Sequence, residues 1–108
     1  MHIINLTPHD IRVVVDEEIW TFPPTIPAAR VKTNNVLLGM AGEFPIYQVV
    51  YEDVEGLPEP MEDTLYVVSA IVATAVKDRP DVVAPDTGST CVRLDSGGLY
   101  AVRGFLKY

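Results

Sequence analysis

The chain has 108 residues, 48% of them hydrophobic, and a formal net charge of −7. This length predicts one domain spanning residues 1–108, and the apolar fraction excludes a disordered chain. The negative charge excludes a general nucleic-acid binder, because contacts with phosphates need a surplus of lysine and arginine. No apolar run reaches the roughly 20 residues that a membrane-spanning helix needs.

Two features of the sequence predict a cytoplasmic location. Cys91 is the only cysteine, so no disulfide can form within the chain, which is typical of a reducing compartment. The first ten residues, "MHIINLTPHD", lack the basic and apolar regions of a signal peptide.

The first half of the chain predicts short strands separated by prolines. "IRVVV" (11–15) and "IWTF" (19–22) predict a hairpin, because both are rich in β-branched and aromatic residues. "ARVKT" (29–33) and "VLLG" (36–39) predict two further short strands. "FPIYQVVYEDV" (44–54) predicts the longest strand, with alternate residues on its two faces.

The second half predicts a buried strand over 65–68, followed by a short helix over 70–76 with Ser69 as its N-cap. This helix is apolar nearly all round and is therefore expected to be buried. Strands at 91–94 and 99–105 flank a glycine-containing turn and predict a hairpin. The predicted fold is α+β and mainly antiparallel β, a small sheet or a barrel-like sheet, with one short buried helix.

The stretch "KDRPDVVAPDTGST" (77–90) is the strongest candidate for a ligand site. A turn of this composition can form an anion-binding nest of backbone amides, and arginine adds bidentate contacts to phosphate or carboxylate. The candidate ligand-binding residues of this region and the strands after it are Arg79, Asp86, Thr87, Ser89, Arg93 and Arg103. The alternative is a purely structural turn, in which Arg79 pairs with Asp78 or Asp81.

A second candidate is "NLTPHDI" (5–11). The side chains of Asn5, Thr7 and Asp10 are of the types that hydrogen-bond to their own backbone in a turn. The functional interpretation places His9 at the mouth of a site, beside Asn5 and Thr7, as an acid, a base or a hydrogen-bond donor.

The sequence contains no recognised catalytic or metal-binding pattern. It lacks a nucleophile elbow, a phosphate-binding glycine motif and any zinc or calcium ligand spacing. Cys91, at the start of a predicted strand, has the usual place of a small buried hydrophobe. We therefore expect no catalytic residue, no metal and no cofactor.

Several segments together resemble a family of short proteins that occur in phage, prophage and bacterial genomes. These segments are "NLTPHDI", "GLPEP", "YVVSAIVATAV", "DRPDVVAPDTG" and "RLDSGGLYAVRGF", and they cover nearly the whole chain. Phages encode small proteins that sequester cyclic or ADP-ribose-type nucleotide signals of bacterial immune systems. The family resemblance supplies this genomic setting and assigns no catalytic residues. A compact phage-type protein with arginines around a polar loop and no catalytic motif is similar to this anti-defence class of non-enzymatic binding proteins.

On this hypothesis one or more of Arg79, Arg93 and Arg103 bind phosphates. An aromatic side chain stacks on the base, and the candidates are Trp20, Tyr47, Tyr51 and Tyr66. Enclosing a polyanion usually takes more surface than 108 residues offer, so a homo-oligomer is expected.

Two alternative functions stay open. The chain could be a protein-interaction module that inhibits a host protein through its acidic segment, which spans residues 52–63. It could also be a small nucleotide-cleaving enzyme with His9 as the acid or base.

Overall fold

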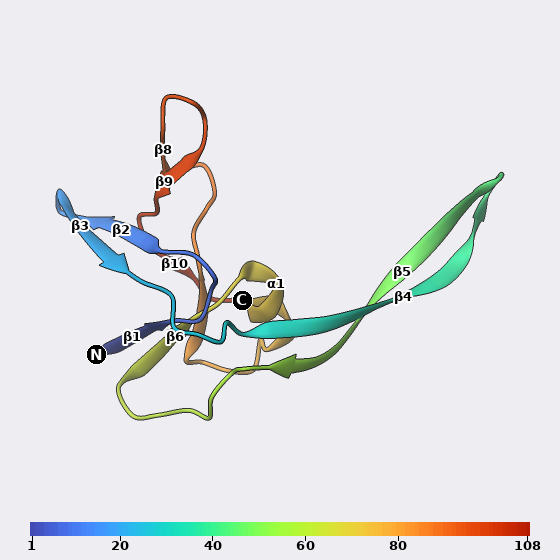
Figure 1. Cartoon of the computed structure of the whole chain (residues 1–108), viewed down its shortest axis with the longest axis horizontal. Helices are drawn as coiled ribbons and strands as arrows, with labels where there is room; N and C mark the ends of the chain where they lie inside the picture. The colour runs from blue at the N-terminus through green and yellow to red at the C-terminus, as the bar shows by residue number, and fades with distance from the viewer.

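The centre of the fold is a four-stranded sheet with the strand order β1-β6-β7-β10 (Figure 1). The computed structural model describes all residues from Met1 to Tyr108. The four strands are β1 (His2–Asn5), β6 (Thr64–Val67), β7 (Val82–Pro85) and β10 (Phe105–Leu106). Both β1 and β7 run parallel to β6, whereas β10 is antiparallel to β7.

The predicted class is confirmed: the fold is α+β, rich in β-strands, with one short helix. Parallel pairing at its centre is a feature that the sequence pattern did not predict. For β6 and β7 it arises because helix α1 (Ala70–Ala75) connects them, and such a crossover returns the chain in the same direction. The parallel β1–β6 pair forms only after the chain has passed through residues 6–63. The remaining three sheets are two-stranded and antiparallel.

Both faces of the central sheet are covered, which explains why β6 and β7 are continuous apolar runs. Alternate residues point to opposite faces and join two separate core clusters. The first cluster packs against helix α1 and consists of Leu6, Ala29, Tyr66, Val68, Val72, Ala73, Val82 and Ala84. The second lies on the other face and consists of Ile11, Val13, Val67, Val83 and Val102.

Helix α1 buries a narrower face than its composition predicts. Val72 and Ala73 are buried, but Ile71 remains 46% exposed. Ser69 occupies the predicted N-cap position, although its side chain makes no capping hydrogen bond. The helix lies on the outside of the first cluster, so only its inner side can be covered.

The predicted hairpin of strands β2 (Ile11–Val15) and β3 (Glu18–Phe22) is confirmed. A two-residue turn, Asp16-Glu17, joins them, and both residues have positive φ, 50° and 67°. This turn conformation suits the right-handed twist of a hairpin but is strained for residues other than glycine, asparagine and aspartate.

The predicted C-terminal hairpin is divided between two sheets. Strands β8 (Val92–Arg93) and β9 (Leu99–Ala101) pair with each other, and β10 then leaves to join β7. Between them, Val102 forms a parallel bridge with Val13 of β2. Val102 is almost fully buried in the second cluster, so its burial draws the chain away from a simple hairpin.

The longest element is a ribbon of β4 (Arg30–Ala41) and β5 (Phe44–Glu55), which projects from the rest of the molecule (Figure 1). We call residues 30–55 the arm and the remainder the body. The sequence predicts two short strands where β4 is one strand of 12 residues with bulges. Only the root of the arm joins the body core, through Val31 and Val54.

The arm makes the molecule elongated. The radius of gyration is 16.5 Å and the longest dimension is 53 Å. A compact domain of this length has a radius of gyration of about 13 Å. Most of the arm therefore lies outside the volume that a chain of 108 residues would fill.

Replacing Glu17 by glycine is expected to stabilise the fold by about 0.5–1 kcal/mol, because glycine adopts positive φ without a steric penalty. Thermal unfolding should show a melting temperature several degrees higher. Glu18→Gly is the matched control, since Glu18 is a strand residue and glycine there should destabilise. A lower melting temperature for Glu17→Gly would contradict the conformation described for the turn.

Candidate functional site

The "NLTPH" turn is organised by the buried side chain of Asn5. Its Nδ2 donates to the carbonyl oxygens of His9 and Phe22, at 2.7 and 2.8 Å. Its Oδ1 accepts hydrogen bonds from the backbone N–H and the hydroxyl of Thr7, at 2.9 and 2.7 Å. Asn5 thus uses its donors and its acceptor to hold the turn, and it is only 1% exposed.

A groove of about 510 Å³ opens beside this turn. It brings together four segments that are far apart in the sequence: the turn with the start of β2, the start of α1, the end of β7 with the loop after it, and β9. Three of the predicted site residues, Thr7, His9 and Thr87, line it. Its other lining residues include Asp10, Arg12, Ser69 and Tyr100.

Arg12 and Tyr100 form a stacked pair at this groove. The guanidinium carbon of Arg12 lies 5.4 Å from the centre of the Tyr100 ring. Backbone hydrogen bonds of 2.8 Å from Val14 to Val102 and from Val102 to Arg12 place the two strands side by side. Arg12 makes no ion pair, although Asp10 lines the same groove. Its charge is therefore available to an anionic ligand.

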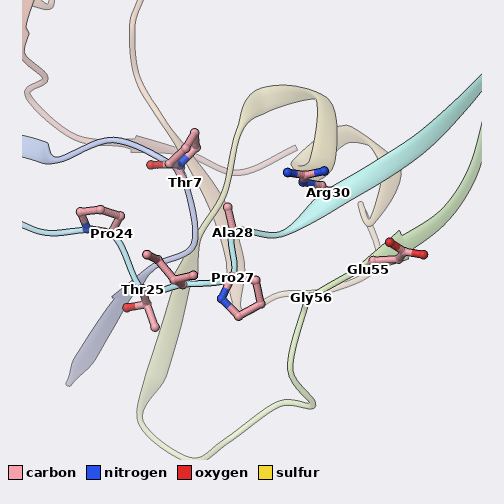
Figure 2. Close-up of a pocket in the computed structure, with 10 residues that line it drawn as sticks. Thr7, Pro24, Thr25, Pro27, Ala28, Arg30, Glu55 and Gly56 are labelled. Atoms are coloured by element: carbon pink, nitrogen blue, oxygen red, sulfur yellow. The ribbon is translucent and has the colours of Figure 1, made fainter.

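A second hollow, of about 500 Å³, lies where the arm meets the body (Figure 2). We call it the root hollow. Thr7 and Pro8 line both the groove and the root hollow, so the "NLTPH" turn separates the two. The remaining residues of the root hollow are Pro24, Thr25, Ile26, Pro27, Ala28, Arg30, Glu55 and Gly56.

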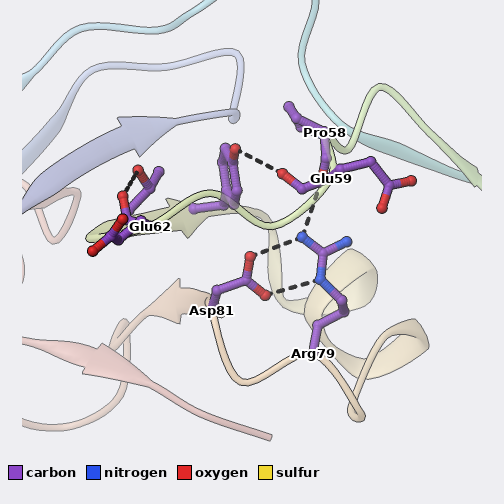
Figure 3. Close-up of polar contacts among 7 residues, drawn as sticks. Pro58, Glu59, Glu62, Arg79 and Asp81 are labelled. Carbon is purple, nitrogen blue, oxygen red and sulfur yellow. Dashed lines mark hydrogen bonds and ion pairs between the residues drawn. The ribbon is translucent and has the colours of Figure 1, made fainter.

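Arg79 forms an intramolecular ion pair with Asp81, one of the two partners expected from the sequence. Its guanidinium donates two hydrogen bonds of 2.8 Å to Asp81 and one of 3.0 Å to the carbonyl oxygen of Pro58 (Figure 3). Hydrogen bonding from Arg79 lowers the pKa of Asp81, and the same bonds raise the pKa of Arg79. Arg79 and Thr87 flank opposite ends of β7, so Arg79 does not line the groove.

The loop after β7 holds itself together through Asp86. Its carboxylate accepts hydrogen bonds from the Gly88 N–H at 3.1 Å and from the Thr90 hydroxyl at 3.4 Å. The amide predicted to bind an anion is thus hydrogen-bonded to a carboxylate of the same loop. Ser89 is exposed and makes no hydrogen bond within the chain, whereas Thr87 reaches the groove.

The other two predicted arginines are bonded to backbone carbonyls. Arg93 donates to Gly97 at 3.2 Å, and Arg103 donates to Thr90 at 3.0 Å. Neither side chain lines the groove.

The four aromatic residues proposed for base stacking do not line the groove either. Tyr66 is fully buried and donates its hydroxyl to the carbonyl oxygen of Glu59. Tyr47 and Tyr51 lie on the arm, and Trp20 lines a separate apolar hollow beside β2 and β3. Tyr100 is the aromatic residue of the groove, and its place depends on the parallel bridge between β2 and the end of β9.

No hydrogen-bonded pair of nucleophile and base is present. The His9 imidazole makes no hydrogen bond within the chain, and the Cys91 thiol contacts the carbonyl oxygen of Thr87 at 3.6 Å. No group of three histidine, cysteine or acidic side chains could hold a metal ion. The groove offers the guanidinium of Arg12, the aromatic face of Tyr100 and several hydroxyl groups, beside the His9 imidazole and the Asp10 carboxylate.

Comparisons with protein-family models, curated proteins and solved structures find no match to this chain. The resemblance to short phage and bacterial proteins therefore stays a prediction. Helix α1, with six residues, is too short to cross a membrane, and the chain has no other helix.

Replacing Asn5 by alanine should destabilise the protein by about 2–4 kcal/mol, because two carbonyl groups and Thr7 lose their hydrogen-bond partner in a buried place. Chemical unfolding of the purified variant would measure this loss. The control is Ser89→Ala, which removes an exposed hydroxyl and should change stability by less than about 0.5 kcal/mol. Equal stabilities of the two variants would contradict the role assigned to Asn5.

Asp81→Asn should lower the unfolding free energy by about 1–2 kcal/mol at pH 7, because the charge-assisted bonds to Arg79 are weakened. The pKa of Asp81 is lowered on folding, so its contribution is present above the unfolded value of about 3.9. The contribution is lost as the pH falls through the lower, folded pKa. The difference between wild type and variant should therefore narrow in urea titrations at pH 3 and below.

Asp78→Asn is the matched control, because Asp78 makes no ion pair. A constant difference for Asp81→Asn across the acidic range would show that the charge of Asp81 contributes nothing to stability.

Proposed function

We propose that the protein binds and sequesters a small anionic ligand of the nucleotide class in the groove beside the "NLTPH" turn. The observation that carries this proposal is the Arg12 guanidinium stacked over Tyr100 at 5.4 Å, without an ion-pair partner. An unpaired guanidinium suits a phosphate, and an aromatic ring suits a nucleobase.

The size and the lining of the groove support the proposal. Its volume of about 510 Å³ lies within the range of roughly 300–1,000 Å³ that is common for small-molecule sites. The hydroxyl groups of Ser69, before α1, and Thr87, after β7, both line the groove and make no hydrogen bond within the chain. They can donate to phosphate or ribose oxygens.

Binding without turnover is favoured by the composition of the groove. A cleaving enzyme needs an activated nucleophile or a positioned acid and base. The one histidine of the groove, His9, has no hydrogen-bond partner that would orient its ring. The expected resemblance to phage proteins agrees with sequestration of a nucleotide signal.

Calorimetric titration with ADP-ribose, cyclic ADP-ribose and cyclic dinucleotides tests the proposal. Arg12→Gln should weaken binding of the recognised nucleotide by about ten- to a hundredfold, since a charged contact to phosphate is lost. Tyr100→Ala should weaken it by about tenfold through loss of stacking. Arg93→Gln is the matched control, because it removes the same charge outside the groove and should leave binding unchanged.

The fate of the nucleotide separates the alternatives. Mass spectrometry should recover the bound nucleotide intact, whereas a cleaved product that disappears in His9→Ala would establish the enzyme instead. The absence of binding to every nucleotide, or full binding by Arg12→Gln, would refute the proposed site. The acidic segment and a basic protein partner would then be the function to test.

A further inference from the structure

The arm exposes an apolar surface that no other part of the same chain covers. From Thr33 to Tyr51 its 19 residues include one charged side chain, Glu43. Ten large apolar residues of this stretch are 40–68% exposed: Val36, Leu37, Leu38, Met40, Phe44, Ile46, Tyr47, Val49, Val50 and Tyr51. Contiguous apolar surface of this kind marks a site of association.

Both faces of the arm are apolar. Alternate residues of β5 point to opposite sides, with Tyr47 and Val49 on one face and Phe44 and Ile46 on the other. The outer edges of β4 and β5 are also unpaired. A two-stranded hairpin on its own is marginally stable in water, so this arm requires a partner along its length.

The dimensions of the arm fit association with a second copy of the same chain. Strands of 12 residues are about 40 Å long, and two strands are about 10 Å wide, which gives roughly 400 Å² per face. One face packed against the second arm buries about 400 Å² of each chain, and entry of the tip into the partner's root hollow adds contact area towards the roughly 800 Å² that each partner buries in an interface of standard size. The nearly uncharged arm is also the surface on which two chains of charge −7 can meet with the least repulsion.

The charges at the two ends of the arm are complementary. At its root, Arg30 makes no ion pair, because Glu55 pairs with Lys32 at 2.9 Å. At its tip, Glu43 is exposed and also unpaired. Arms packed in opposite directions bring each tip to the other root, where these charges meet. Arms packed in the same direction would instead place Glu43 beside its own copy.

The root hollow is placed to receive such a tip. Arg30 and Glu55 lie at its edge, where β4 begins and β5 ends (Figure 2). Ile26, which is 88% exposed, and three prolines supply most of its apolar lining. Its volume of about 500 Å³ is sufficient for the side chains of a hairpin tip.

We propose that the arm is a self-association element that forms a two-fold symmetric dimer. The arms of two copies pack in opposite directions, and the tip of each (residues 41–44) enters the root hollow of the other. Glu43 of each copy then meets Arg30 of its partner, so the same contact occurs twice and the assembly closes. This interface is independent of the ligand proposed for the groove.

A charge-swap experiment tests the arrangement. Glu43→Arg and Arg30→Glu each create two like-charge contacts in the dimer and should weaken dimerisation by about tenfold in sedimentation equilibrium. Mixing the two variants should restore a dimer of wild-type strength, because both contacts become oppositely charged in the mixed pair. A mixture that associates no better than the single variants would overturn the proposed arrangement.

A second pair of variants tests the arm faces. Tyr47→Lys should shift the protein towards the monomer by about a hundredfold in dissociation constant, since a charge enters the centre of the interface. Ile19→Lys is the control, because Ile19 is similarly exposed (51%, against 56% for Tyr47) but lies on β3 in the body. Circular dichroism of both variants would verify that the body is folded.

A wild-type protein that remains monomeric at every concentration would refute self-association. A dimer that is equally stable in Tyr47→Lys would place the interface elsewhere. Neither result depends on a nucleotide, so failure of this proposal and failure of the groove proposal can be told apart.

Discussion

The buried amide of Asn5 is the constraint on which the rest of the structure depends. It joins the end of β1 to the carbonyl oxygens of His9, which precedes β2, and of Phe22, the last residue of β3. Backbone bonds from the same turn reach Thr25, Ala29 and Val67. One small turn therefore sets the relative positions of the central sheet, the hairpin and the root of the arm. The groove and the root hollow both form against it, because Thr7 and Pro8 line each of them.

The distribution of apolar residues explains why the molecule has two parts. Almost half of the chain is hydrophobic, yet only 17 of 108 residues are buried. The body uses small side chains, mostly valine and alanine, to cover both faces of a narrow sheet. The larger apolar residues of the arm cannot join this core, because the arm contacts it only through its root. Their burial requires a second molecule, and the proposed dimer supplies it without changing the body.

Some of the arginines hold the fold together, whereas others have no charged partner within the chain. Arg79, Arg93 and Arg103 hydrogen-bond to carbonyl or carboxylate groups of their own chain. Arg12 and Arg30 have no ion pair, and each lines one of the two hollows beside the "NLTPH" turn. On an acidic protein these two unpaired arginines are the positions at which the proposed nucleotide and the proposed partner carboxylate would gain most.

The sequence by itself determined the local elements, because hydrophobic patterning and turn residues act over a few neighbouring positions. These elements are the β2–β3 hairpin, strand β6, helix α1 and the turn that begins at Asn5. For Arg79 the sequence left a bound anion and a pairing with Asp78 or Asp81 as alternatives, and the structure shows the pairing with Asp81. Tertiary structure alone decided the parallel order of β1, β6 and β7 and the separation of the arm from the body. It alone placed Arg12 beside Tyr100, since 88 positions separate them and the burial of Val102 brings their strands together. Such contacts depend on which apolar faces pack against each other in the folded chain, and the local pattern of a single sequence does not specify that packing.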